Sequence, residues 1–225
     1  MKQLRMPVLA VVSLFAVLCV QVPSAQCGQM DKLSLEAAAG NFTLPGMLLG
    51  MDKSIVEHPK RLDGEVRVLR AMYALNEHNL VGVSWMKLSA SGDGNWARKD
   101  TAQQLATNNV AGVITGRTDI DLNGVTLDYE HRFMTIHDVV TPYVRGGLGL
   151  GELTVRFNGK FVGHETQSGM NYPVTNDAND SVKRTVPLVH VEAGMRVALY
   201  KHLGMSVAAF WNTGYGALGA FDLRF

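Results

Sequence analysis

Residues 184–199 read RTVPLVHVEAGMRVAL, a stretch in which apolar and polar side chains alternate with a period of two. In its second half every odd position is apolar, whereas His190, Glu192 and Arg196 occupy even positions. A helix would distribute these charges around its circumference, but a strand places them on one face. The stretch therefore predicts a β-strand with one apolar face and one charged face.

The same alternation returns along the chain and predicts eight strands. They lie near residues 31–42, 65–75, 80–89, 122–133, 140–152, 185–199, 203–212 and 216–225. The connections alternate between short ones at 76–79, 135–139 and 200–202 and long ones at 45–64, 90–121 and 159–184, with a short last connection at 213–215. Short periplasmic turns and long extracellular loops are typical of outer-membrane barrels.

Two Asn-Gly dipeptides leave the number of strands open. Asn123-Gly124 and Asn158-Gly159 are strong signals for two-residue hairpin turns. They predict either hairpins that stand in the long loops or extra strands, for a total of ten. Period two alone also fits a soluble periplasmic or secreted β-barrel, so the choice depends on the two chain ends.

The N-terminus has the pattern of a secretory signal peptide. A basic start is followed by an apolar run at 8–20 and by the small residues that end at Ala25. We expect a cleaved signal peptide at 1–25 and one barrel domain at 26–225. No later apolar run is long enough for a spanning helix, so the mature chain could cross a membrane only as a closed barrel.

Charge and cysteine content narrow the function classes. Cleavage would remove Lys2 and Arg5 and no acid, which leaves 19 basic and 20 acidic residues and a formal charge of −1. A nearly neutral chain gives no support for nucleic-acid binding, which needs a basic face. The one remaining cysteine, Cys27, follows Gln26 rather than the small residue of a lipidation site, and we expect a lone thiol.

Two segments resemble known barrel motifs. Residues 220–225, AFDLRF, resemble the C-terminal signal by which outer-membrane barrels are recognised for insertion, with Phe221, Leu223 and Phe225 as its apolar positions. Residues 141–151, TPYVRGGLGLG, resemble the Pro-Tyr and glycine-rich strand of the small outer-membrane barrel family, the OmpA- and OmpX-like proteins.

This resemblance implies a fold, a place and a set of partners. The fold is an all-β, transmembrane, antiparallel up-and-down barrel of about eight strands with long extracellular loops, in the cell outer membrane. The expected partners are outer-membrane lipid and lipopolysaccharide, the barrel-assembly machinery during insertion, and an extracellular ligand that the loops could bind.

Alternation also predicts what fills the barrel. The inward rows hold five acids and five arginines, which are Glu36, Arg70, Asp128, Glu130, Arg132, Arg145, Glu192, Arg196, Asp222 and Arg224. An eight-stranded barrel is just wide enough for its own side chains, and buried charges are costly unless paired. We therefore expect an ion-pair network that plugs the lumen, with a narrow gated pore as the alternative.

An enzymatic role has weaker support. The third long connection contains a nucleophile, base and acid set with unspecific spacing, namely His164, Ser168, Asp177, Asp180 and Ser181. His131 interrupts a lipid-facing row near Phe133, a position that fits the membrane interface. No metal-ligand spacing stands out. We expect a structural or surface-interaction barrel without cofactor or catalytic residues, and a lipid A-modifying enzyme as the weakest alternative.

Overall fold

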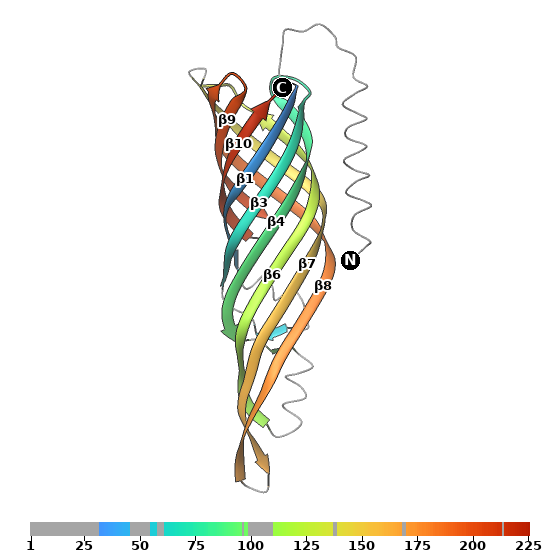
Figure 1. Ribbon diagram of the computed structural model, residues 1–225, viewed down its shortest axis with the longest axis vertical. Coiled ribbons are helices and arrows are strands. Elements are labelled where there is room, and N and C mark those ends of the chain that lie inside the picture. The colour runs from blue at the N-terminus through green and yellow to red at the C-terminus, as the bar shows by residue number, and fades with distance from the viewer. Residues whose placement is uncertain are drawn as a thin grey trace.

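Eight antiparallel strands close into a barrel in the computed structural model of the chain (Figure 1), which describes residues 32–45, 55–57, 61–95, 97–98, 110–136, 139–167, 170–212 and 214–225. The barrel strands are β1 (Leu33–Pro45), β3 (Arg61–Ala74), β4 (Asn79–Asn95), β6 (Val110–Arg132), β7 (Val140–Gln167), β8 (Met170–Tyr200), β9 (Leu203–Asn212) and β10 (Gly214–Arg224). Two short strands, β2 (Ile55–Glu57) and β5 (Ala97–Arg98), pair separately. The predicted eight-stranded up-and-down barrel is confirmed. The proposed signal peptide and Cys27 lie outside the described residues.

The strands follow one another around the barrel, and β1 closes it by pairing with both β3 and β10. Rows of paired residues do not return to their starting point. The row through Ala39 reaches β8 at Thr185 in one direction and ten residues away, at Met195, in the other. Such a stagger tilts the strands by about 35–45° from the barrel axis. Among the described residues no helix is long and apolar enough to span a membrane.

Two of the predicted long loops, at 90–121 and 159–184, are much shorter than expected, because the strands continue into them. The residue pairs between β7 and β8 run without a break to Gln167 and Met170, so the predicted loop at 159–184 is largely strand. β4 likewise extends to Asn95 and β6 starts at Val110. The alternation of apolar and polar side chains continues in these strand extensions. It reverses, with polar side chains outside and apolar side chains inside.

Both Asn-Gly dipeptides lie inside continuous strands, so the hairpin and ten-strand interpretations are wrong. Gly124 pairs with Gly151, and a Cβ atom on Gly124 would collide with the side chain of Leu188. Gly159 pairs with Gly116 beneath the ring of Phe157. These glycines make room for large inward side chains rather than supplying a turn.

The barrel has two halves that differ in polarity. We call the half next to the short turns and the C-terminus the turn-side half, and the other the loop-side half; the turn side is at the top of Figure 1. Outward apolar side chains of the turn-side half are exposed, among them Leu35, Leu69, Leu127, Leu148, Leu150, Val191, Met195, Val207 and Phe221. Contiguous exposed apolar surface of this extent marks a lipid-facing belt.

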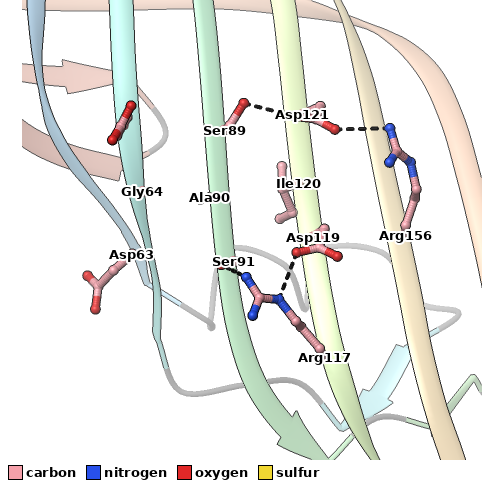
Figure 2. Close-up of a pocket in the computed structure, with 11 residues that line it drawn as sticks. Asp63, Gly64, Ser89, Ala90, Ser91, Arg117, Asp119, Ile120, Asp121 and Arg156 are labelled. Atoms are coloured by element: carbon pink, nitrogen blue, oxygen red, sulfur yellow. Dashed lines mark hydrogen bonds and ion pairs between the residues drawn. The ribbon is translucent and has the colours of Figure 1, made fainter.

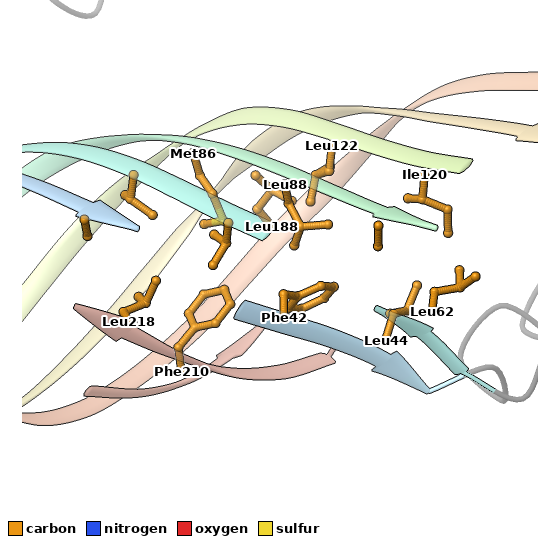
Figure 3. Packing of buried hydrophobic residues seen from close by; sticks show 14 of the residues in the cluster. Phe42, Leu44, Leu62, Met86, Leu88, Ile120, Leu122, Leu188, Phe210 and Leu218 are labelled. Carbon is orange, nitrogen blue, oxygen red and sulfur yellow. The ribbon is translucent and has the colours of Figure 1, made fainter. Parts of the chain in front are cut away.

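In the loop-side half the arrangement is inverted. The outward rows carry polar residues, among them Glu65, Arg67, Lys87, Ser89, Asp121, Thr154 and Arg156. The inward rows form a buried apolar cluster inside the barrel (Figure 3), which includes Phe42, Leu62, Leu88, Ile120, Leu122, Leu188, Phe210 and Leu218. This half therefore has the pattern of a water-exposed barrel with its own hydrophobic core.

Candidate functional site in the barrel lumen

The turn-side lumen contains the ten charged residues singled out in the sequence. Eight of them are buried, namely Glu36, Arg70, Asp128, Glu130, Arg145, Glu192, Arg196 and Asp222. The side chains of the other two, Arg132 and Arg224, are 16% and 23% exposed. Successive side chains of a strand point to opposite faces of the sheet. All ten residues occupy inward positions, and the residues next to them in sequence point outward.

Arg145 on β7 is the centre of the network. Its guanidinium lies 2.9 Å from Glu36 and 3.1 Å from Glu192, and its Nε donates to Glu130 over 2.9 Å. The side chain has no exposed surface. One planar fork thus joins carboxylates from three strands, a geometry for which arginine is suited and lysine is not.

Two further arginines complete the arrangement. Arg70 pairs with Glu36 and, over 2.5 Å, with Glu192. Arg196 lies 2.8 Å from both Glu36 and Glu130. Each of the three glutamates therefore contacts at least two guanidinium groups, which offsets the cost of burying its charge.

The network becomes more open toward the short turns. Arg196 lies 3.3 Å from Asp222, and Arg224 also pairs with Asp222 over 2.8 Å. Arg132 pairs with Glu130 over 2.8 Å. The two partly exposed arginines thus extend the buried network to the rim of the barrel.

Several polar residues of the network were not singled out from the sequence. Tyr143 donates a hydrogen bond to Glu192 over 2.7 Å, and the guanidinium carbons of Arg145 and Arg196 lie 5.2 and 5.3 Å from its ring centroid. Tyr143 lies two residues before Arg145 and therefore on the same inward face of the strand. This spacing is the sequence signal that could have identified Tyr143 as part of the network, where its ring can face a guanidinium.

Asp128 stands slightly apart from the arginines. It accepts hydrogen bonds from Ser84 and, over 2.6 Å, from Thr126, whereas Arg70 Nε is 4.0 Å away. Nε2 of His190 is 3.8 Å from Asp128, and neither ring nitrogen of His190 has a hydrogen-bond partner within the described part of the chain. Gly147 opposite leaves space for both side chains, since a Cβ atom there would collide with each of them.

The loop-side apolar cluster lies directly beyond the charged network. The rings of Phe42 and Phe210 are 6.1 Å apart at 56°, a tilted contact between β1 and β9 (Figure 3). Leu88 on β4 and Leu188 on β8 are each 2% exposed and belong to the same buried cluster. This layer was not identified from the sequence, because only charged residues were singled out on the inward rows and residues 45–64, 90–121 and 159–184 were interpreted as loops.

The possible enzyme residues are spread along the β7–β8 hairpin. His164 pairs with Pro173, whereas Asp180 pairs with Phe157, seven residues further along β7 and roughly 23 Å away. Asp177 and Ser181 lie opposite other β7 residues, Lys160 and Arg156. Ser168 lies outside the described residues. Because this segment is an extended hairpin and not a compact loop, its candidate catalytic residues lie far apart along the strands.

His131 takes part in a different local structure. Its Nδ1 is 2.9 Å from Asn79 Oδ1, and its ring meets Phe133 edge-on at 5.0 Å between centroids. These contacts are at the turn-side rim and explain a polar residue in an apolar row. In the described ranges no three histidine, cysteine or acidic side chains are grouped as metal ligands would be.

Comparison with known proteins places the fold. No protein-family model and no curated protein sequence matches the chain. Neisserial surface protein A, NspA, superposes with a TM-score of 0.51 at 13% identity, over 87% of this chain and 98% of that one. Ail of Yersinia pestis (16% identity, 87% and 100% covered) and the N-terminal barrel domain of OprF from Pseudomonas aeruginosa (13%, 88% and 100%) both give TM-scores of 0.42. The likeness to NspA, together with the lipid-facing belt, confirms that the chain has the fold of a small eight-stranded outer-membrane β-barrel.

Proposed function

We propose that the chain is a non-conducting outer-membrane barrel with a structural or surface-interaction role. The observation that carries this proposal is the filling of the lumen in two successive layers. The turn-side layer is a neutralised ion-pair network centred on Arg145, and the loop-side layer is the apolar cluster around Phe42. An ion would have to break buried salt bridges and then cross a dry core, and both steps are costly.

The length of the connections supports an orientation. The three connections on the turn side are all short, whereas the loop side carries the two longest connections, at 46–60 and 96–109. The C-terminus also lies on the turn side, and the side with only short connections faces the periplasm in outer-membrane barrels. The loop-side half then stands outside the cell, with its polar wall in water. A rigid β-structure at that height is suited to present the connecting segments to a partner.

The proposal includes no catalytic residues. The buried carboxylates Glu36, Glu130 and Glu192 are each held by arginines, so guanidinium groups already occupy their oxygens. His164 and Asp180 are too far apart along the hairpin to act together. Lipid A modification would need a set of reactive groups that these residues do not form.

The C-terminal strand supports a role in assembly. Phe221, Leu223 and Phe225 point outward and are 61%, 49% and 62% exposed. We propose that this apolar row on β10 is the insertion signal that the barrel-assembly machinery binds. Phe225→Ala should lower the amount of heat-modifiable protein in the outer membrane while refolding of the purified chain in detergent stays unchanged. An equal loss in both assays would contradict a role in recognition.

Single-channel recording in a planar lipid bilayer tests the closed lumen. The purified chain should insert, as shown by its heat-dependent mobility in gels, and give no steady current steps. An open porin in the same bilayer provides the positive control. Steady open-state currents would overturn the closed lumen and favour a narrow gated pore.

A further inference from the structure

Three surface zones follow one another on the outer wall formed by β3, β4, β6 and β7. Strand register aligns them. Leu69 pairs with Trp85, Arg67 with Lys87, and Glu65 with Ser89. The change from apolar to charged therefore occurs at the same step on both strands. The wall passes from lipid-facing residues to a pair of cations and then to a polar hollow.

The first zone is apolar and exposed. Leu69 and Trp85 are 54% and 36% exposed, and Leu127 on β6 is 66% exposed. Each points away from the barrel, and together they form part of a contiguous exposed apolar surface. Hydrocarbon chains of a lipid fit this surface.

The second zone is a pair of like charges. Arg67 and Lys87 face each other directly across the β3–β4 ladder, an arrangement that destabilises a sheet unless an anion lies between the two. Arg67 reaches Glu65 over 3.2 Å with its side chain 72% exposed. Lys87 has no ion-pair or hydrogen-bond partner among the residues that the structure describes. One carboxylate for two cations leaves a net positive spot.

The height of this spot suggests what neutralises it. From Leu75 at the short turn to Arg67, eight residues of a strand tilted by about 40° rise roughly 20 Å. The apolar band of an outer-membrane barrel is about 25 Å tall. Arg67 and Lys87 therefore lie at the far edge of the band, where their charged ends can reach the headgroups of the outer leaflet. The anions that a membrane offers at that depth are the phosphates of lipid headgroups.

The third zone is the polar hollow of Figure 2. Ser89 donates to Asp121 over 2.9 Å, and Arg156 contacts the same carboxylate over 3.1 Å. Beside them Arg117 donates to Ser91 over 2.8 Å. The short serines form the floor between longer charged side chains. Hydroxyl, carboxylate and guanidinium groups on one exposed surface can hydrogen-bond to sugar hydroxyls.

We propose that this wall binds a phosphorylated glycolipid of the outer leaflet. Its acyl chains lie on the apolar zone, a phosphate contacts Arg67 and Lys87, and its sugars enter the hollow above them. This inference rests on the proposed orientation of the barrel. It adds a specific lipid site to the general contact with a membrane.

Native mass spectrometry of the full chain released from detergent micelles tests the phosphate contact. The probe is a bisphosphorylated lipid A-type glycolipid, with its dephosphorylated form for comparison. A cation near a membrane surface contributes about 1 kcal/mol, so R67Q/K87Q should weaken binding of the phosphorylated probe roughly ten- to thirty-fold. The dephosphorylated probe should bind the variant and the unmodified chain equally.

A matched control separates a site from general charge. Lys160→Gln with Lys183→Gln removes two outward cations of the loop-side half that lie on β7 and β8. This control should bind the phosphorylated probe as the unmodified chain does. Equal weakening of probe binding in both double variants, or no weakening in R67Q/K87Q, would overturn the proposal that Arg67 and Lys87 form the phosphate site. Displacement of the glycolipid by an equal concentration of inorganic pyrophosphate would contradict the claim that the ligand is a lipid and not a free phosphate.

The hollow has a separate test. Arg156→Gln should weaken binding of a glycolipid that carries core sugars several-fold and leave the sugar-free probe unaffected. Equal effects on both probes would contradict sugar binding in the hollow. Every variant is first checked for the heat-dependent mobility shift of an inserted barrel. Absence of that shift in the unmodified chain would refute the proposed function itself, which distinguishes the two failures.

Discussion

The turn-side and loop-side halves are built from the same eight strands, yet the polarity of their inner and outer faces is opposite. On β3 the turn side has Leu69 outside and Arg70 inside, whereas the loop side has Arg67 outside and Val66 inside. The backbone ladder is continuous across the change. The surrounding solvent, lipid or water, therefore determines which face of an alternating strand is apolar.

The two halves also obtain their rigidity differently. The turn-side lumen depends on directional contacts, because each buried carboxylate needs a guanidinium in the right place. The loop-side lumen depends on shape, because leucine and phenylalanine side chains fill it without specific partners. Single substitutions should therefore act through lost charge compensation in one half and through cavities in the other.

The largest effect is expected from Arg145→Met. This change leaves Glu36, Glu130 and Glu192 short of positive charge in a buried space. Removing one partner of a buried ion pair costs about 3–5 kcal/mol. Urea unfolding in detergent, followed by gel mobility, measures the free energy of unfolding. The exposed Arg156→Met is the control and should change it by less than about 0.5 kcal/mol.

A smaller but still large loss is expected from Leu88→Ala. Leu88 is buried in the loop-side cluster, and its removal leaves a cavity worth about 3 kcal/mol. The lipid-facing Leu148→Ala, at a residue that is 66% exposed, creates no cavity and should cost less than half as much. Equal losses in the same urea assay would mean that the loop-side core is not packed as described.

The outer surfaces should differ in their tolerance of charge. Leu127→Arg places a cation in the middle of the belt, which costs about 2 kcal/mol or more. Thr154→Arg makes the same kind of change on the polar wall of the loop side and should be nearly neutral. Unfolding in lipid vesicles compares the two variants. Similar costs would contradict the inversion of the outer face.

The smallest effect concerns pH and the loop-side wall. Arg61, over 2.7 Å, and Thr43, over 2.8 Å, donate hydrogen bonds to Asp63 and lower the pKa of its carboxyl. A lowered folded-state pKa stabilises the fold above the ordinary pKa of about 3.9, and this stabilisation is lost as the pH falls through the folded value. The stability difference between the unmodified chain and D63N should therefore shrink below about pH 4. A difference that is constant with pH would rule out this pair as its source.

The sequence predicted the turn-side half far better than the loop-side half. Strong contrast between apolar rows and residues such as Glu192 and Arg196 fixed strand phase, strand number and the inward set of charges. On the loop side both rows are less distinct, and Asn158-Gly159 imitates a turn although its glycine lies under Phe157. Which charges touch depends on the stagger of the closed barrel, and no local pattern encodes that three-dimensional arrangement.

Site-directed spin labelling tests the inversion most directly. Single cysteines replace outward residues 69 and 83 on the turn side and 65 and 89 on the loop side, in a chain without Cys19 and Cys27. Nitroxides there report access to oxygen, which concentrates in lipid, and to a water-soluble nickel chelate. We expect oxygen access at 69 and 83, nickel access at 65 and 89, and a crossover between Leu69 and Arg67 on β3. Uniform nickel access at all four positions would contradict the lipid belt and with it the division of the barrel into two halves.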